Sequence, residues 1–235
     1  RLLKPLEYYQ KKYGTSLYGL NKMYLLMEKQ HNRGQDGVGL ANVKLDVAPG
    51  KRYISRKRSV ASNPIQDVFK QVNKRFVELE ERDPDKLKDP KWMKENLPFT
   101  GELFLGHLRY GTFGSNTIEQ CHPFLRQNNW KTRNLVLAGN FNMTNVDELF
   151  EQLLDLGQHP KQMADTVTIL EKIGHFLDEA NDDIYYENRE KFSKKEITKV
   201  IEDKLDLQDV LTQSAKYWDG GYVMCGFRKI NIWPF

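Results

Sequence analysis

Two short segments of the chain carry side chains suited to binding a small anionic or zwitterionic molecule. In residues 106–112 (Gly-His-Leu-Arg-Tyr-Gly-Thr), Arg109 offers a permanent cation for a carboxylate and Thr112 offers a hydroxyl donor. In residues 137–145, the side-chain amide of Asn140 could donate a hydrogen bond to an anionic reaction intermediate. Neither segment is diagnostic alone, so the prediction of a site depends on their occurring together.

Three motifs in register extend this pattern. Gln-His-Asn-Arg-Gly-Gln-Asp-Gly at residues 30–37 precedes residues 106–112, and Asn-Phe-Asn-Met-Thr-Asn follows at residues 140–145. Their order resembles class II glutamine amidotransferases, and the amidophosphoribosyltransferase branch is the most similar, as far as about Cys225. The resemblance implies an α+β fold, a four-layer αββα N-terminal-nucleophile hydrolase sandwich, which we expect to be incomplete at one or both ends.

The resemblance also assigns ligands for glutamine. Arg109 and Thr112 match the family's ligands for the α-carboxylate, and Asp165, in an Asp-Thr setting, matches the ligand for the α-amino group. On the residues alone, Arg109 could pair with a structural carboxylate and Thr112 could be a turn residue. Asp165 could be a helix N-terminal acid favoured by the macrodipole. A zwitterionic substrate needs both charges, which favours the functional interpretation.

The remaining motif residues correspond to the oxyanion hole and its support. The Asn140 side chain and the Phe141 backbone N–H match the family's two oxyanion donors, with Phe141 standing where the family has glycine. Phenylalanine would be strained there if the position needs a positive φ. His31 and Arg33 resemble the family's His-Arg-Gly turn that supports the pocket, with Asn32 as an insertion.

In the family, an N-terminal cysteine attacks the glutamine amide, and the ammonia passes to a synthase domain or partner. This chain begins at Arg1 instead, so we expect no glutaminase activity from the chain as given. Cys121 and Cys225 are expected to be structural. The alternative function is a catalytically silent glutamine-binding or scaffolding domain, and a Cys-Gly pair encoded just before Arg1 would exclude it.

The composition predicts a single glutaminase-like domain over residues 1–235. Hydrophobic residues make up 39% of the chain and charged residues 29%, and the mean hydropathy is −0.68. No apolar run approaches the roughly 20 residues of a membrane helix, so no membrane partner is expected. The absence of a signal peptide and the two distant cysteines favour the cytoplasm. No segment resembles a phosphoribosyl-pyrophosphate site, so no phosphoribosyltransferase domain is expected.

The net charge of +4 decides little about partners. The basic run at residues 51–58 could contact phosphate, but Tyr53 and Ile54 among basic residues are typical of an exposed strand and its turn. We therefore expect no nucleic-acid partner. The five histidines show no metal-ligand spacing, so neither a metal nor a cofactor is expected. Glutamine is the expected ligand, and a homo-oligomer stays possible.

Periodicity and turn signals predict the elements that must position these residues. Helices are predicted at residues 17–29, 65–81, 164–177 and 194–216, and strands at 37–43, 102–108, 134–137 and 220–226. The motifs at 106–112 and 140–145 would then lie where strands end.

Three connecting segments have their own signals. Residues 83–97, rich in lysine, aspartate and proline, predict an exposed insertion, and the acidic residues 178–188 predict a solvated helix face or a loop. Asn145 with Glu148 predicts a capping box, with Gly157 past the helix end. Asp36 is expected to be a turn or capping residue.

Overall fold

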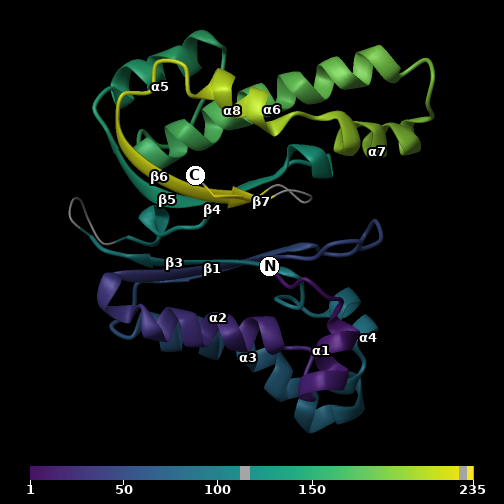
Figure 1. Cartoon of the computed structure of the whole chain (residues 1–235). Coiled ribbons are helices and arrows are strands. Elements are labelled where there is room, and N and C mark those ends of the chain that lie inside the picture. Colours follow the sequence, from purple (N-terminus) through teal and green to yellow (C-terminus); the bar gives the residue numbers. More distant parts are fainter. Residues whose placement is uncertain (112–116, 228–231, 235) are drawn as a thin grey trace. The chain divides into compact units, whose positions relative to one another are not determined.

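The computed structural model describes residues 1–111, 117–227 and 232–234. The chain divides into two compact units, Arg1–Pro123 and Phe124–Phe235, called the first and the second unit below. Each unit combines one antiparallel sheet with helices on one face of that sheet (Figure 1). The α+β class is confirmed at this level.

The first unit contains a three-stranded sheet in the order β2–β1–β3. Its elements are α1 (Leu6–Tyr13), α2 (Tyr18–Lys29), the 3₁₀ turn η1 (His31–Arg33), β1 (Gly37–Val43), β2 (Ile54–Ser59), α3 (Pro64–Arg82), η2 (Pro84–Lys88), α4 (Pro90–Asn96), β3 (Leu103–Arg109) and η3 (Ile118–Gln120). Helices α2 and α3 cover one face of this sheet (Figure 1).

Alternation along β1 explains how the first unit is packed. Val38 and Leu40 join the core cluster that includes Val68 of α3, and both are 0% exposed. Gly39 faces the other way, and a Cβ built on it would lie 1.8 Å from the His122 carbonyl oxygen. Only glycine lets the backbone of the His122 segment approach β1 this closely.

The predicted exposed insertion contains η2 and α4. Most of its side chains are exposed or half-buried, but Met93 of α4 is 1% exposed and belongs to the core cluster of the first unit. The side chain of Asp89 caps α4 by accepting a hydrogen bond from the backbone N–H of Trp92 (3.0 Å). The segment is therefore anchored to the core by a short capped helix that the sequence analysis did not predict.

The second unit contains a four-stranded sheet in the order β4–β5–β6–β7. Its elements are β4 (Phe124–Arg126), η4 (Lys131–Arg133), β5 (Leu135–Met143), α5 (Val146–Asp155), α6 (Asp165–Asn188), α7 (Lys194–Lys204), α8 (Leu207–Ser214), β6 (Gly220–Phe227) and β7 (Ile232–Pro234). Leu135 and Leu137 of β5 pack with Leu149, Ile169 and Ile173 from α5 and α6.

Two helix predictions in the second unit are corrected. Helix α6 runs on past residue 177 through the acidic residues 178–188, so of the two alternatives predicted for this segment the helix is confirmed and the loop is wrong. Within it, Asp178 pairs with Arg126 (2.6 Å) and Asp182 pairs with Arg133. The predicted helix at 194–216 is two helices, because the Asp206 side chain accepts hydrogen bonds from Gln208 N and Asp209 N and so begins α8.

The capping box predicted at Asn145 does not form. Asn145 occupies the N-cap position of α5, but its side chain donates to the Tyr217 carbonyl (2.7 Å) and accepts from the Asp219 N–H (3.2 Å). It therefore holds the turn before β6 rather than the helix start. Gly157 follows α5 with φ +78°, as predicted.

Candidate functional site

Arg109 is the last residue of β3 and lies opposite Gly37 of β1. Its side chain is almost buried, with the residue 9% exposed. The guanidinium donates through Nη2 to Gln120 Oε1 (2.7 Å) and through Nη1 to the Thr117 carbonyl (3.4 Å). Both acceptors are neutral, and no ion pair among the described residues includes Arg109. The cation is held in place while its charge stays available for an anion.

The turn after α2 supports the backbone of Arg109. The Asp36 N–H donates to the Arg109 carbonyl (3.1 Å), and Asp36 Oδ2 accepts from the Gly111 N–H (2.7 Å). A Cβ on Gly34 would lie 2.7 Å from the carbonyl carbon and oxygen of Arg109. Asp36 is therefore more than a turn residue, because it ties two separate segments together.

The predicted pocket-support residues His31 and Arg33 are both exposed. His31 Nδ1 lies 2.8 Å from the Glu28 carbonyl oxygen of its own helix. The contacts between this turn and Arg109 come from Gly34 and Asp36, so the supporting role of His31 and Arg33 stays a prediction. The glycine between Arg33 and Gln35 was the available signal for a close backbone approach.

Two arginines of the basic run hold the segment that follows η3. Arg58 Nη1 donates to the Cys121 carbonyl (2.7 Å) and Arg56 Nη1 to the Pro123 carbonyl (3.3 Å). Cys121 is 0% exposed, and burial raises the pKa of its thiol. Burial also lowers the pKa of His122 to about 3, assisted by the nearby positive charges. The basic run thus has a structural role within the first unit.

Asn140 and Phe141 lie within β5 and not beyond its end, which corrects the predicted strand boundary. The strand continues to Met143 because β6 pairs with it along its length, with Asn140 opposite Val223 and Phe141 opposite Tyr222. Phe141 is absent from the positive-φ residues of the described chain, so replacing glycine by phenylalanine costs no left-handed strain here.

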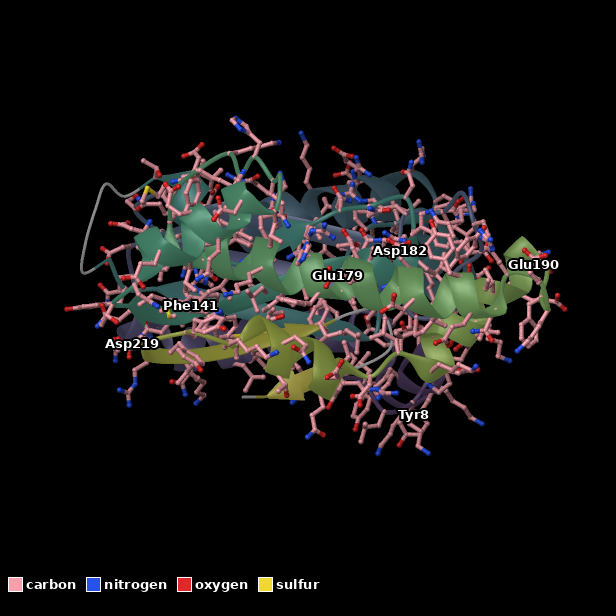
Figure 2. All side chains as sticks on the ribbon, turned by 90° about the horizontal axis from the view of Figure 1, so that it is seen from above. Tyr8, Phe141, Glu179, Asp182, Glu190 and Asp219 are labelled. Carbon is pink, nitrogen blue, oxygen red and sulfur yellow. The ribbon has the colours of Figure 1, made fainter. Side chains whose placement is uncertain are left out.

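Two hydrogen bonds fix the direction of the Phe141 N–H. The Thr144 N–H points toward β6, where it donates to the Asp219 carbonyl (3.1 Å). The Met143 N–H points to the opposite edge of β5 and donates to Asp165 Oδ2 (3.1 Å). Because alternate residues of a strand direct their N–H groups to the same side, the Phe141 N–H shares the edge on which Asp165 lies. Figure 2 labels Phe141 and Asp219.

The side chains of β5 alternate between its two faces. Phe141 and Met143 pack into the helix-covered core of the second unit, while Asn140 is exposed on the opposite face. The Asn140 amide and the Phe141 N–H are therefore separate donors, one standing out of the sheet plane and one lying in it.

Asp165 is the first residue of α6, as the sequence analysis predicted. It is half-buried, and its carboxylate lies where the helix macrodipole favours a negative charge. The hydrogen bond from Met143 joins the start of α6 to the edge of β5.

The second unit thus brings Asp165 and the Phe141 N–H to one edge, and the first unit places Arg109 against Gly34 and Asp36. Thr112 lies outside the described residues. The sequence analysis missed Gln120, the side-chain partner of Arg109, which stands in a turn without a motif of its own.

No described helix has both the length and the apolar character to cross a membrane. In residues 1–111, 117–227 and 232–234, no group of three or more histidine, cysteine, aspartate or glutamate side chains is arranged to hold a metal ion.

Solved structures show a similar fold. The glutamine phosphoribosylpyrophosphate amidotransferase from B. subtilis, complexed with ADP and GMP, superimposes with a TM-score of 0.50 over 88% of this chain, at 20% identity. The match covers 32% of that chain. At this identity the likeness concerns the fold alone.

Curated proteins show similarity in sequence, although no protein-family model matches the chain. An amidophosphoribosyltransferase of Pasteurella multocida (strain Pm70) is 29% identical over 150 residues, or 63% of this chain and 23% of the relative. One of Lacticaseibacillus casei is 34% identical over 76 residues, or 32% of this chain and 38% of the relative. The chain therefore matches well under half the length of these proteins. The sequence matches and the shared fold relate this chain to the amidophosphoribosyltransferases.

Proposed function

We propose that this chain is the glutamine-binding, glutaminase-type region of a protein related to amidophosphoribosyltransferase, with a role in purine biosynthesis. The buried Arg109 guanidinium carries the proposal, because its described partners are neutral and its backbone is braced by Gly34 and Asp36. A rigid arginine of this kind suits the α-carboxylate of an amino acid.

The other proposed glutamine-binding groups belong to the second unit. Asp165 provides a carboxylate for the α-ammonium group, and the N–H of Phe141 is directed to the same strand edge. With the Asn140 amide, this N–H would stabilise the oxyanion formed when a thiolate attacks the glutamine amide. Thr112 is assigned the second contact to the α-carboxylate. His31 and Arg33 are assigned the role of supporting the binding turn.

Neither described thiol suits the nucleophile. Cys121 is fully buried, and burial raises the pKa of both Cys121 and Cys225, which disfavours the thiolate. Ammonia release therefore belongs to a protein in which a Cys-Gly pair precedes Arg1. Without that pair, the chain would serve as a catalytically silent glutamine-binding or scaffolding domain.

The proposal also includes the four-layer αββα N-terminal-nucleophile sandwich. Its support is that each unit pairs one sheet with helices on one of the faces of that sheet. A synthase domain or partner would receive the ammonia, the cytoplasm is the proposed location, and the glutaminase step needs no cofactor.

Calorimetric titration with L-glutamine tests the binding residues. Arg109→Ala and Asp165→Asn should each weaken binding by about tenfold or more, since each removes a charge-assisted contact. Arg75→Ala on the exposed face of α3 and Asp147→Asn in the first turn of α5 are matched controls and should bind normally. Unchanged affinity in both test variants would exclude the assigned pocket.

A second measurement separates the two functions. Ammonia release from glutamine is compared between the chain as given and the protein translated with its native upstream codons. Release only from the longer protein supports the glutaminase, whereas glutamine binding without release from either supports the silent domain.

A further inference from the structure

A hollow of about 340 Å³ lies in the second unit, where α5, α6 and the turn after α8 meet. Its apolar walls come from Leu153 and Leu156 of the α5 region and from Phe176 of α6, and the ring of Tyr217 also lines it. The size falls in the range of sites for small molecules.

Lys172 of α6 is the buried charge of this hollow, with the residue only 4% exposed. Its Nζ donates to Gln152 Oε1 (2.9 Å) and to the Lys216 carbonyl (3.1 Å). Both acceptors are neutral, and no ion pair in the described part of the chain includes Lys172. An ammonium group has three N–H donors, so these two hydrogen bonds leave one N–H of Lys172 for a further acceptor.

Burial of this cation is unfavourable without a counter-ion. Consistent with this, burial lowers the pKa of Lys172. Two further charged residues line the hollow, Lys216 and Asp155, and both are exposed. With Lys172, the lining carries two cations and one carboxylate, which leaves a net positive charge at a mainly apolar surface.

The turn that borders the hollow is held in a strained conformation. Tyr217 has φ +70°, a left-handed backbone region that is unfavourable for a residue other than glycine. Asn145 holds this turn through the Tyr217 carbonyl and the Asp219 N–H. The Tyr217 ring lies over Lys172, with Nζ 5.8 Å from the ring centroid. Strain of this kind is concentrated at ligand sites.

We propose that this hollow binds a small carboxylate with an apolar or aromatic body. The carboxylate accepts the remaining N–H of Lys172, and the body packs against Leu156, Phe176 and Tyr217. The site is distinct from the proposed glutamine site, because none of the residues assigned to that site lines the hollow.

The test compares 3-phenylpropionate with its neutral analogue 3-phenylpropionamide, by NMR titration of the whole chain. We expect the carboxylate to bind at least about tenfold more tightly than the amide, because only the carboxylate neutralises Lys172. Lys172→Met should remove this preference. The matched control Lys199→Met, on the exposed side of α7, should keep it. Equal affinities in the wild-type chain would overturn the proposal, as would a preference retained by folded Lys172→Met.

A footprinting experiment on the wild-type chain avoids any folding defect of the variant. Reductive methylation of Lys172 should be slowed by 3-phenylpropionate more than by 3-phenylpropionamide, and equal protection would overturn the proposal. Arg109→Ala should leave 3-phenylpropionate affinity unchanged, which separates this site from the glutamine site. A loss of affinity in that variant would mean that 3-phenylpropionate binds at Arg109 and not in the hollow.

Discussion

At the scale of single residues, the absence of a side chain at Gly34 positions the candidate site. A Cβ there would meet the backbone of Arg109 and Leu108 at 2.7 Å, and backbone atoms cannot move aside as a flexible side chain can. Gly34→Ala should therefore displace the end of β3 and weaken L-glutamine binding by about tenfold, as measured by calorimetry.

Gly221→Ala is the control for this substitution, because a Cβ there meets nothing within 4 Å. It should leave both thermal stability and glutamine affinity unchanged. Normal glutamine binding by Gly34→Ala would show that the turn does not determine where Arg109 lies.

His122 makes stability depend on pH. Burial, followed by the charges of His107, Arg109 and Arg58, lowers its folded-state pKa from 6.5 to about 3. Below pH 6.5 the unfolded chain binds a proton that the folded chain does not bind, so stability falls as pH decreases from 6.5 toward 3. The expected loss is about 1.4 kcal/mol per pH unit in this window.

Urea unfolding between pH 6.5 and 5 can isolate this effect, since most carboxylates stay ionised there. His122→Asn should flatten the decrease by about 1–2 kcal/mol relative to wild type. His159→Asn, at an exposed histidine, should not flatten it. Parallel curves for wild type and His122→Asn would mean that His122 titrates normally in the folded protein.

At the scale of elements, ion pairs join α6 to the segments before β5. Arg126 binds Asp178 through both of its terminal nitrogens (3.2 and 2.6 Å), and Arg133 binds Asp182, which Figure 2 labels on α6. Asp178→Asn would leave a largely buried guanidinium without its main counter-ion.

We expect Asp178→Asn to lower the free energy of unfolding by about 1–3 kcal/mol. Asp183→Asn, one residue beyond Asp182 on the exposed side of the same helix, should change it by less than about 0.5 kcal/mol. Urea denaturation measures both. Equal stability of the two variants would place the Arg126 pair among the surface contacts that contribute little.

The sequence patterns correctly predicted those helices and strands that are determined by residues close together in the sequence. The apolar periodicity of residues 17–29 and 65–81 and the small-residue run at 37–43 gave α2, α3 and β1 to within a residue or so. Helix α6 was cut short at residue 177, because its acidic second half is stabilised by Arg126 and Arg133, which lie far away in sequence.

The same limit applies to the candidate site. The motif positions of Arg109 and Asp165 at element ends were predicted correctly. The Gln120 partner of Arg109 and the tie from Asp36 to Gly111 depend on the return of the chain after β3, for which the sequence carries no periodic signal. Likewise, the Asn145 side chain donates a hydrogen bond to the Tyr217 carbonyl, which is distant in sequence, and does not cap its own helix.

At the scale of the whole molecule, each of the two compact units has its own buried cluster, one around Leu40 and one around Leu149. Leu40→Ala should therefore raise amide hydrogen exchange mainly in β1, β2 and β3. Leu149→Ala should raise it mainly in α5, α6 and β5, because local openings follow the cooperative unit that is weakened. Exchange that increases equally in both units for either variant would show a single cooperative core.

Asp165 and Lys172 both belong to α6, which is one continuous helix. Seven residues of an α-helix rise about 10 Å and complete almost two turns, so the two residues lie on nearly the same side of the helix. A ligand that shifts the helix axis at Lys172 would shift Asp165 with it. Occupancy of the hollow by a carboxylate and of Asp165 by an ammonium group would then be coupled, by the same free energy in both directions.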